Sequence, residues 1–170
     1  MPSTFIPIEK IDALVFDFDG VLTDNRVLVN QEGVEFVSCS RGDGLAFDVL
    51  RKIKKPVFIL STEENSVVTT RGDKLKVPVI QGVKNKVTAI KSLAETNNFN
   101  LKNILYIGND LNDYYAMGLC GYSACPSDSH NKIKQIAKVT LTAKGGAGVA
   151  RELLEDVLQI DFLTVLYTNQ

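Results

Sequence analysis

The sequence predicts an α/β protein in which a parallel β-sheet lies between two layers of helices. Short, almost continuously apolar runs alternate with segments that show helical periodicity. Strands that are apolar on both faces are typical of a parallel sheet covered by helices on both sides. The chain has 170 residues, and no linker-like or repetitive segment divides it. We therefore expect one domain over residues 1–170.

The predicted strands and helices follow one another in a regular order. Strands are expected at residues 14–16, 57–60, 77–80, 104–107, 122–124 and 139–141. Helices are expected at residues 45–54, 66–75, 86–95, 112–118 and 131–137. In the helix at 86–95, Val87, Ile90 and Leu93 recur at helical spacing, so this side of the helix should face the sheet.

Two segments depart from this alternation. The stretch "RVLVNQEGVEFVSC", residues 26–39, reads as two strands around a turn at 30–33, which predicts a β-hairpin directly after the first strand. A glycine-rich tail begins at residue 145 and continues as a helical pattern into the apolar stretch "QIDFLTVLYTNQ". That stretch could pack on this subunit or on a neighbour.

Composition and charge narrow the classes of function. The 19 Lys and Arg residues nearly balance the 20 Asp and Glu residues, for a formal net charge of −1. Such a balance gives no global field to attract nucleic acid or an anionic membrane, so we expect neither as a partner. There is no bilayer-length apolar run and no signal-peptide pattern. Three scattered cysteines predict neither a disulfide framework nor a zinc site, and together these features favour a cytoplasmic protein.

An acidic pair interrupts the first apolar strand. In "LVFDFDGVLTDN", Asp17 and Asp19 are separated by Phe18 alone, and the two-residue period of a strand would point both to the same side. Carboxylates so close repel each other unless a cation lies beside them or one binds a proton. Mg²⁺ meets this need, because it commonly binds one or two carboxylates together with substrate phosphate. The pair therefore predicts a magnesium site.

Further polar residues follow the later strands, at the edge of a parallel sheet where ligands bind. These residues are Ser61–Glu63 after "VFIL", Asn109–Asp113 after "ILYIG", and Lys84 and Lys86 after "VPVIQGV". Lys84 is expected to face solvent, whereas Ser61 and Lys86 can hold phosphate oxygens. The turn at residues 108–110 could bring another oxygen ligand to the metal.

These residues fit a phosphate-transfer site. An ionised Asp17 beside a metal-polarised phosphate is a competent nucleophile that would form an aspartyl-phosphate. Asp19 can protonate the leaving alkoxide and then deprotonate the attacking water. The predicted catalytic residues are Asp17, Asp19, Ser61 and Lys86.

The motifs together resemble those of the haloacid dehalogenase superfamily of phosphohydrolases. "DFDGVLTD" resembles the first motif, "ILST" the second, "QGVKNK" the third and "IGNDLND" the fourth, so the resemblance spans essentially the whole chain. It implies a Rossmann-like α/β/α fold and Mg²⁺-dependent phosphomonoester hydrolysis. Carried onto this sequence, the metal ligands are Asp17 and Asp19 together with Asn109 or Asp110.

A narrower resemblance is to the 3-deoxy-D-manno-octulosonate 8-phosphate phosphatase family. The hairpin in place of a large cap domain, "GDGLAFDVL", "QGVKNK" and the tail "GGAGVARE" carry it. Related phosphatases act on 2-keto-3-deoxynononate 9-phosphate and N-acylneuraminate 9-phosphate. Members form homotetramers in which a neighbour's hairpin and tail help to close each active site. The resemblance thus implies that residues 145–152 act as a lid and that Arg151 meets an anionic part of the substrate or a neighbouring acid.

The second motif departs from the eight-carbon enzymes. Those usually carry Ser/Thr-Gly-Arg, where this chain has Ser61, Thr62 and Glu63. The combination of Glu63 with Arg71 and Lys74 resembles the nine-carbon branch, which implies that Thr62, Glu63 and Lys74 contact the sugar acid and that Arg71 pairs with its carboxylate. We therefore favour a nonulosonate 9-phosphate as substrate, with 3-deoxy-D-manno-octulosonate 8-phosphate as the alternative.

The fourth motif also departs, because most of the superfamily has a metal-binding Asp at the position of Asn109. An amide oxygen can still bind Mg²⁺, but it adds no charge, so either Asn109 is the ligand or Asp110 has taken over. The same departure occurs in related domains fused to sialic-acid activating enzymes, which serve mainly in oligomerisation. A catalytically weak scaffold for a sugar-acid cytidylyltransferase is therefore the alternative from another class.

Structural roles stay open for several of these residues. Asp17 and Asp19 could be a structural pair salt-bridged to basic residues, and Ser61 could cap a helix while it also binds phosphate. Arg71 and Lys74 could form an ordinary solvated helix face. Asp24 could be a turn residue or a functional one. Asp113 is expected to support the metal-site loop or Lys86, and His130, the one histidine, is assigned no role.

Overall fold

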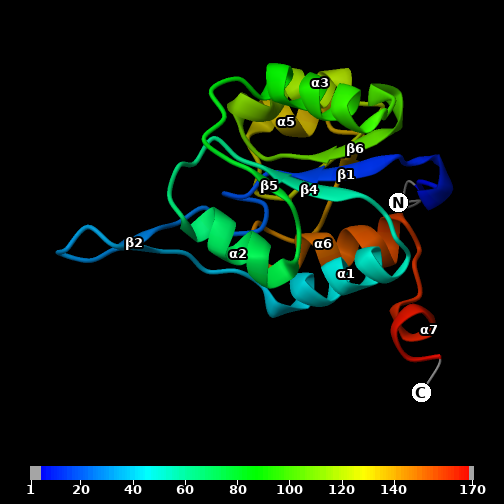
Figure 1. Cartoon of the computed structure of the whole chain (residues 1–170), viewed down its shortest axis with the longest axis horizontal. Helices are drawn as coiled ribbons and strands as arrows, with labels where there is room; N and C mark the ends of the chain where they lie inside the picture. The colour runs from blue at the N-terminus through cyan, green and yellow to red at the C-terminus, as the bar shows by residue number, and fades with distance from the viewer. Residues whose placement is uncertain (1–4, 169–170) are drawn as a thin grey trace.

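The structure, a computed structural model, describes residues 5–168 and confirms the predicted α/β/α architecture (Figure 1). Its sheet has six strands in the order β5-β4-β1-β6-β7-β8, and every neighbouring pair is parallel. The strands are β1 (Ala13–Phe16), β4 (Val57–Leu60), β5 (Val79–Ile80), β6 (Ile104–Ile107), β7 (Tyr122–Cys125) and β8 (Val139–Thr140). The chain passes to β4 and β5 on one side of β1 and then crosses to β6 on the other. Such a reversal places a ligand-binding crevice at the carboxyl ends of these strands.

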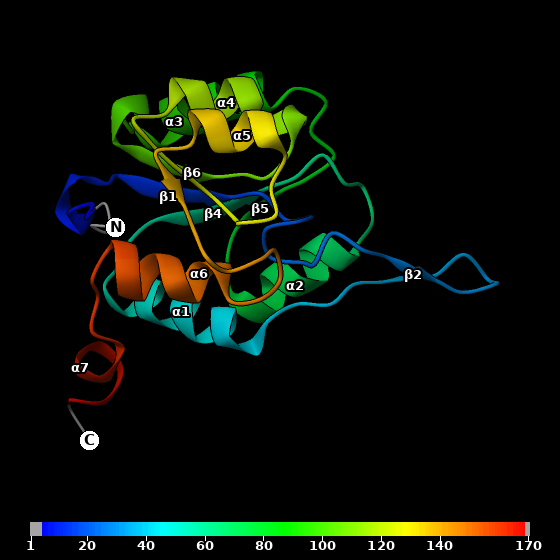
Figure 2. The same cartoon turned by 180° about the vertical axis from the view of Figure 1, so that it is seen from behind.

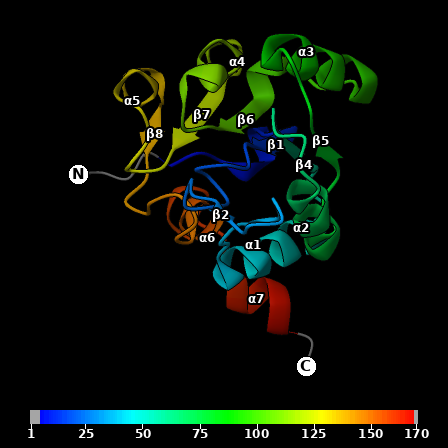
Figure 3. The same cartoon turned by 90° about the vertical axis from the view of Figure 1, so that its left-hand side faces the viewer.

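Helices cover both faces of the sheet (Figures 1 and 2). One layer consists of α3 (Lys86–Asn97), α4 (Tyr114–Leu119) and α5 (Asn131–Ile136), and the other of α1 (Arg41–Lys52), α2 (Val67–Leu75) and α6 (Val149–Glu152). Figure 3 shows the same two layers from the side. A π-helical turn (Leu153–Val157) continues α6, α7 (Phe162–Tyr167) packs on α1, and short 3-10 turns lie at Ile8–Lys10, Leu101–Asn103 and Leu111–Asp113. No helix within residues 5–168 is long and apolar enough to cross a bilayer.

Alternate strand residues belong to two separate hydrophobic cores. Leu14 and Phe16 of β1 pack in the core under α1 and α6, whereas Val15 packs with Tyr106 in the core under α3, α4 and α5. All four side chains are fully buried. Because β1 is covered on both faces, it appears in the sequence as an uninterrupted apolar run.

Several element boundaries differ from the sequence prediction, and two of these differences have a clear local cause. Helix α1 begins at Arg41, not at residue 45, because the Ser40 side chain accepts a hydrogen bond from the Gly42 N–H and caps the helix there. Strand β5 begins at Val79, not at residue 77. Pro78 has no N–H to give to a ladder, and the Val77 N–H is already bonded to the Gly72 carbonyl.

The first strand ends before the acidic pair. β1 stops at Phe16, and Asp17 and Asp19 lie in the loop that follows, so the expectation that strand alternation orients both carboxylates is wrong. One further sheet bond, from the Asp17 N–H to the Ile107 carbonyl, fixes the start of this loop. Beyond it the chain turns tightly, and the Val21 and Leu22 N–H groups both return to the Phe18 carbonyl. The loop therefore places the two acids.

The predicted hairpin is present and projects from the body of the molecule (Figures 1 and 2). Its strands β2 (Leu28–Val29) and β3 (Glu35–Phe36) pair antiparallel. At its base, Thr23 and Cys39 form an isolated antiparallel bridge. Five large apolar side chains of the hairpin are about half exposed or more, namely Val27, Leu28, Val29, Val34 and Phe36. A short hairpin that exposes this much apolar surface is typical of an interaction surface.

The glycine-rich segment is packed against the loop that follows β1. A Cβ at Gly145 would lie 2.3 Å from the Gly20 carbonyl oxygen, and one at Gly146 would lie 2.5 Å from the Asp24 nitrogen. The Gly146 N–H also donates to the Val21 carbonyl at 3.0 Å. Close packing and a hydrogen bond therefore hold Gly145 and Gly146 as a support for this loop, and the lid expected at residues 145–152, which would close a neighbouring subunit's site, stays a prediction.

Candidate active site

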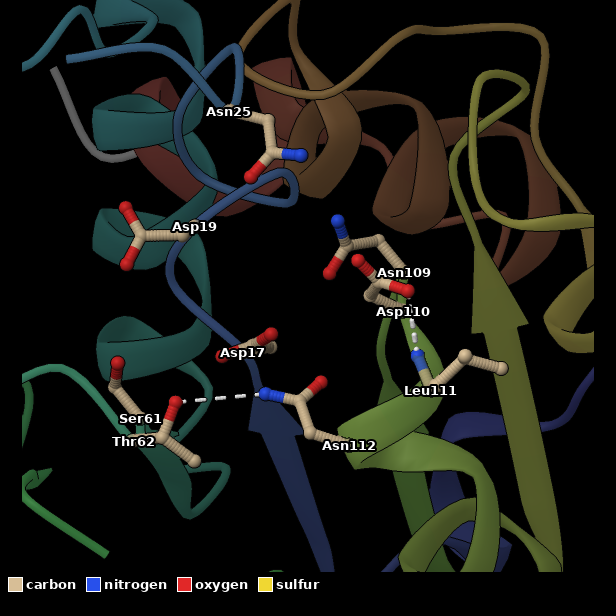
Figure 4. A pocket seen from close by; sticks show the side chains of 9 residues that line it. All are labelled: Asp17, Asp19, Asn25, Ser61, Thr62, Asn109, Asp110, Leu111 and Asn112. Carbon is tan, nitrogen blue, oxygen red and sulfur yellow. Dashed lines mark hydrogen bonds between the residues drawn. The ribbon is translucent and has the colours of Figure 1, made fainter.

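A pocket of about 370 Å³ opens at the carboxyl ends of β1, β4 and β6 (Figure 4). Three separate loops supply its lining: Asp17, Asp19 and Asn25, then Ser61 and Thr62, then Asn109, Asp110, Leu111 and Asn112. Six of these nine residues are ones that the sequence analysis assigned to the site. The fold thus brings the predicted catalytic and metal-binding residues to one place.

Asp17 forms the floor of the pocket and is only 4% exposed. One carboxylate oxygen, Oδ1, accepts hydrogen bonds from the Phe18 N–H at 2.7 Å and from Lys86 Nζ at 2.8 Å. Oδ2 accepts no hydrogen bond from the described residues. Burial, with the neighbouring charge of Asp113, raises the pKa of the Asp17 carboxyl to about 8, so an additional cation is needed to keep it ionised firmly at neutral pH.

Lys86 lies between two buried acids and is itself 3% exposed. Its Nζ is 2.8 Å from Asp17 Oδ1 and 2.6 Å from Asp113 Oδ1. Burial disfavours the charge on this ammonium, but the attraction of the two carboxylates outweighs it and the pKa of Lys86 is raised. Asp17 is thus salt-bridged to a lysine distant in sequence, which the sequence analysis could not foresee.

Asp113 is fully buried and accepts four hydrogen bonds. Its Oδ1 accepts from Lys86 Nζ and from the Tyr106 hydroxyl at 2.8 Å, and its Oδ2 accepts from the N–H groups of Asn109 at 2.9 Å and Asp110 at 3.3 Å. Both open interpretations of Asp113 therefore hold, because it supports the metal-site loop and Lys86 together.

Asp19 lies two residues further along the loop and is half-buried. Burial first, and then the nearby charge of Glu63, raise the pKa of its carboxyl, so it retains a proton more readily than an exposed acid. Thr23 organises this turn, since its buried hydroxyl oxygen accepts from the N–H groups of Gly20 at 3.1 Å and Asn25 at 3.2 Å. Asp24 accepts from the Arg26 N–H, as a turn residue does.

Ser61 begins the loop after β4 and is 1% exposed. Its hydroxyl accepts from the Glu63 N–H at 3.1 Å; it does not cap a helix, because α2 begins only at Val67. Thr62 reaches across the pocket, where its hydroxyl accepts from the Asn112 amide at 3.4 Å (Figure 4). Glu63 uses Oε1 to accept from the N–H groups of the next two residues and does not line the pocket.

Asn109 presents an unpaired oxygen to the pocket. Its side chain is 6% exposed, and among the described residues its buried Oδ1 has no hydrogen-bond partner. A Cβ at Gly20 would lie 1.9 Å from Asn109 Nδ2, so the glycine makes room for the amide. Asp110, by contrast, is exposed and turns Oδ1 back to the Leu111 N–H at 2.7 Å. Asn109 is therefore the better placed of the two to bind a cation.

The residues of the pocket fit a hard divalent cation. Lys86 is shared between two buried acids, so the buried cluster carries an excess of negative charge. Residues 5–168 contain no metal-suited cluster of three or more His, Cys, Asp or Glu side chains. A site of two carboxylates and one amide oxygen, completed by phosphate and water, is nonetheless within the usual range for Mg²⁺. Asp17, Asp19 and Asn109 would supply those protein ligands.

Besides Glu63, the structure places three more of the predicted substrate-binding residues outside the pocket. Arg71 and Lys74 line a second hollow of about 490 Å³ between β3 and α2. There the Arg71 guanidinium donates to the Ser40 carbonyl at 2.9 Å. The Arg151 side chain, on α6, pairs with Glu155 at 2.8 Å and stacks over the Phe162 ring. None of the three lines the pocket of its own subunit.

Sequence reasoning missed four residues of the site. Asn25, Leu111 and Asn112 line the pocket, and Tyr106 anchors Asp113 from within the core. Leu111 and Asn112 fall inside "IGNDLND" and could have been found from that motif. Tyr106 read as an apolar strand residue, and Asn25 as the end of a turn. His130, expected to have no role, caps α5 and donates its N–H to the Asn109 carbonyl at 2.9 Å.

Comparison with known proteins defines the class of enzyme. A family model for haloacid dehalogenase-like hydrolases matches residues 48–153. A solved HAD family hydrolase from Streptomyces avermitilis is 40% identical, covers 95% of this chain and 93% of its own, and has a TM-score of 0.90. The chain belongs to the haloacid dehalogenase-like hydrolases. Within that family it is a phosphatase.

Two phosphatases resemble this chain over most of their length, whereas a larger relative resembles it over about a third. The 3-deoxy-D-manno-octulosonate 8-phosphate phosphatase of Salmonella typhimurium is 28% identical over 92% of this chain and 84% of its own. The Moraxella catarrhalis enzyme of the same name, solved with magnesium, phosphate and KDO, is 27% identical with a TM-score of 0.85, covering 89% and 88% of the two chains. An N-acylneuraminate cytidylyltransferase of Oncorhynchus mykiss is 28% identical over 88% of this chain, which spans only 36% of that protein.

Proposed function

We propose that this phosphatase uses Mg²⁺ to remove phosphate from a 2-keto-3-deoxy sugar acid phosphate, with a nonulosonate 9-phosphate as the favoured substrate. The observation that carries the hydrolytic chemistry is the convergence of Asp17, Asp19 and Asn109 on one pocket, above Lys86. The sugar acid class is supported by two kinds of relative, namely phosphatases of an eight-carbon acid and an enzyme that activates a nine-carbon one.

The positions of the side chains suggest their roles. Asp17 is the nucleophile: Oδ1 is held by Lys86 and the Phe18 N–H, which leaves Oδ2 to attack phosphorus and form an aspartyl-phosphate. Asp19 protonates the leaving alkoxide and then deprotonates the water that releases phosphate. Lys86 and the Ser61 hydroxyl hold phosphate oxygens. When bound, Mg²⁺ supplies positive charge to the phosphate and to the acids around it.

Recognition of the sugar acid needs positive charge that the pocket does not supply. None of its nine lining residues is Lys or Arg, and Lys86 below it is already paired with two acids. Arg71 and Lys74 face a different hollow, beside the exposed hairpin. We assign them to the carboxylate of a substrate bound in a neighbouring subunit, within a homotetramer to which the apolar hairpins contribute contacts.

Mixing two inactive variants tests this arrangement in trans. D17N lacks the nucleophile and R71A lacks the cation, and neither should hydrolyse the sugar acid phosphate well. If Arg71 serves a neighbour's pocket, unfolding and refolding the two variants together yields mixed oligomers in which some pockets hold both residues, and activity returns. Sedimentation of the wild type as a monomer, or no recovery on mixing, would contradict the proposal.

A panel of substrates separates the candidate sugars. Phosphate release from the nonulosonate 9-phosphates is expected to exceed that from 3-deoxy-D-manno-octulosonate 8-phosphate in kcat/KM. The eight-carbon acid is the second candidate, favoured by the KDO bound in the Moraxella relative. A higher kcat/KM for it would reverse the choice. Release from neither acid, with Mg²⁺ present, would favour the oligomerisation scaffold suggested by the cytidylyltransferase relative.

A further inference from the structure

Asn25 occupies a position in the pocket that the catalytic roles do not explain. It lies on the same loop as Asp17 and Asp19, six residues beyond Asp19, and it lines the pocket with them. Figure 4 shows its side chain directed into the pocket from the edge opposite Thr62 and Asn112, and no hydrogen bond joins it to the other lining residues. The neutral amide is thus left available to a ligand.

The backbone at this position would suit glycine. Asn25 has φ of +63°, a left-handed conformation that glycine adopts freely and that asparagine tolerates better than most residues. The turn alone therefore does not require a carboxamide at this position, and a glycine variant can test the side chain with the backbone unchanged.

The surrounding loop holds Asn25 in place. Its N–H donates to the Thr23 hydroxyl, which is fully buried. Behind the loop, the Gly146 N–H bonds to the Val21 carbonyl, and the Gly146 backbone packs so closely on Asp24 that a Cβ would not fit. These contacts fix the backbone that carries the exposed carboxamide, so less conformational freedom is lost when a hydrogen-bonding partner binds it.

We infer that Asn25 is a specificity-determining residue that binds a hydroxyl group of the leaving group, close to the carbon that bears the phosphate. The inference rests on the proposed function, in which Asp17 attacks phosphorus and Asp19 protonates the leaving oxygen. Asn25 lines the same pocket as Asp17 and Asp19, so a leaving group protonated by Asp19 would lie in the pocket that Asn25 borders. The carboxamide offers both a donor and an acceptor but no charge, which suits a polyol and not a carboxylate.

The test compares substrates with and without hydroxyl groups. Asn25→Gly removes the amide and keeps the left-handed backbone. The readout is the ratio of kcat/KM for the nonulosonate 9-phosphate to kcat/KM for 4-nitrophenyl phosphate, whose leaving group has no alcohol. We expect N25G to lower this ratio at least about tenfold, mainly through KM for the sugar acid, because a site built to bind a hydroxyl discriminates strongly. The matched control is Asn98→Gly, which changes an asparagine at φ +56° in a cap of α3, distant from the pocket.

The outcomes are distinct. A ratio for N25G within about twofold of the wild-type value, or loss of both activities in equal proportion, overturns the role of Asn25. The wild-type panel separately tests the proposed function. If the wild type prefers another polyol phosphate, that compound replaces the sugar acid in the ratio, and Asn25 is judged on it.

Discussion

Gly20 offers a sharp test of how the metal site is built. It adopts φ of +79°, and a Cβ there would lie 1.9 Å from Asn109 Nδ2. To reach an ordinary contact of 3.4 Å, the amide of Asn109 must retreat by about 1.5 Å in a Gly20→Ala variant. Mg²⁺ demands near-ideal octahedral geometry at about 2.1 Å, so a ligand displaced this far is lost. We expect G20A to raise the Mg²⁺ concentration for half-maximal activity at least about tenfold, the equivalent of about 1.4 kcal/mol.

The chain provides a matched control for backbone strain. Gly33, in the hairpin turn, has the same φ of +79°, and nothing lies within 4 Å of a Cβ placed there. Alanine at either position pays about 1–2 kcal/mol for a left-handed conformation, but only G20A also disturbs Asn109. Activity titrated with Mg²⁺ separates the two effects. The reasoning would be refuted if G20A and G33A showed the same Mg²⁺ requirement, or if G20A kept the wild-type value.

Two predictions concern stability measured by urea unfolding. Lys86→Met leaves Asp17 and Asp113 buried without a cation and should lower the unfolding free energy by about 3–5 kcal/mol. The control Lys91→Met, on the exposed side of α3, should change it by less than about 0.5 kcal/mol. Equal losses in the two variants would contradict the stabilising role of the buried ion pair. Burial raises the pKa of Asp43 from 3.8 to about 6, so the stability linked to its protonated form is complete below pH 3.8 and is lost as the pH rises through about 6. Relative to the wild type, D43N should therefore gain on the order of 2 kcal/mol between about pH 4 and pH 7, and a difference that does not vary with pH would contradict this.

The sequence predicted the layers of the fold because the physical signals were local. Each core strand is apolar on both faces, and the helix Lys86–Asn97 shows its buried side through Ile90 and Leu93. The boundaries that were wrong depend on single groups. Ser40 caps α1 earlier than the apolar pattern begins, and Pro78 delays β5. Such choices are decided by individual hydrogen bonds, which periodicity does not reveal.

The part of the candidate site that lies at the strand ends could be predicted from the order of the motifs along the chain. The ends of three strands had to meet at one edge of the sheet, and Asp17, Ser61 and Asn109 do so. The two salt bridges from Lys86 to Asp17 and Asp113 join residues far apart in the chain, so only the fold reveals them. The close packing of Gly145 and Gly146 on the loop of residues 20–24 was equally hidden, because it joins segments more than 100 residues apart.

Two features define the proposed mechanism: Asp17 attacks phosphorus, and a divalent cation offsets the repulsion between the acids of the pocket. The most direct measurement is kcat of D17N at saturating Mg²⁺ with the preferred sugar acid phosphate, since asparagine keeps the shape of the side chain and its contact with Lys86 while it abolishes the nucleophile. A fall of at least about a thousandfold in a variant that still unfolds cooperatively is predicted. Turnover within about tenfold of the wild type would contradict the account.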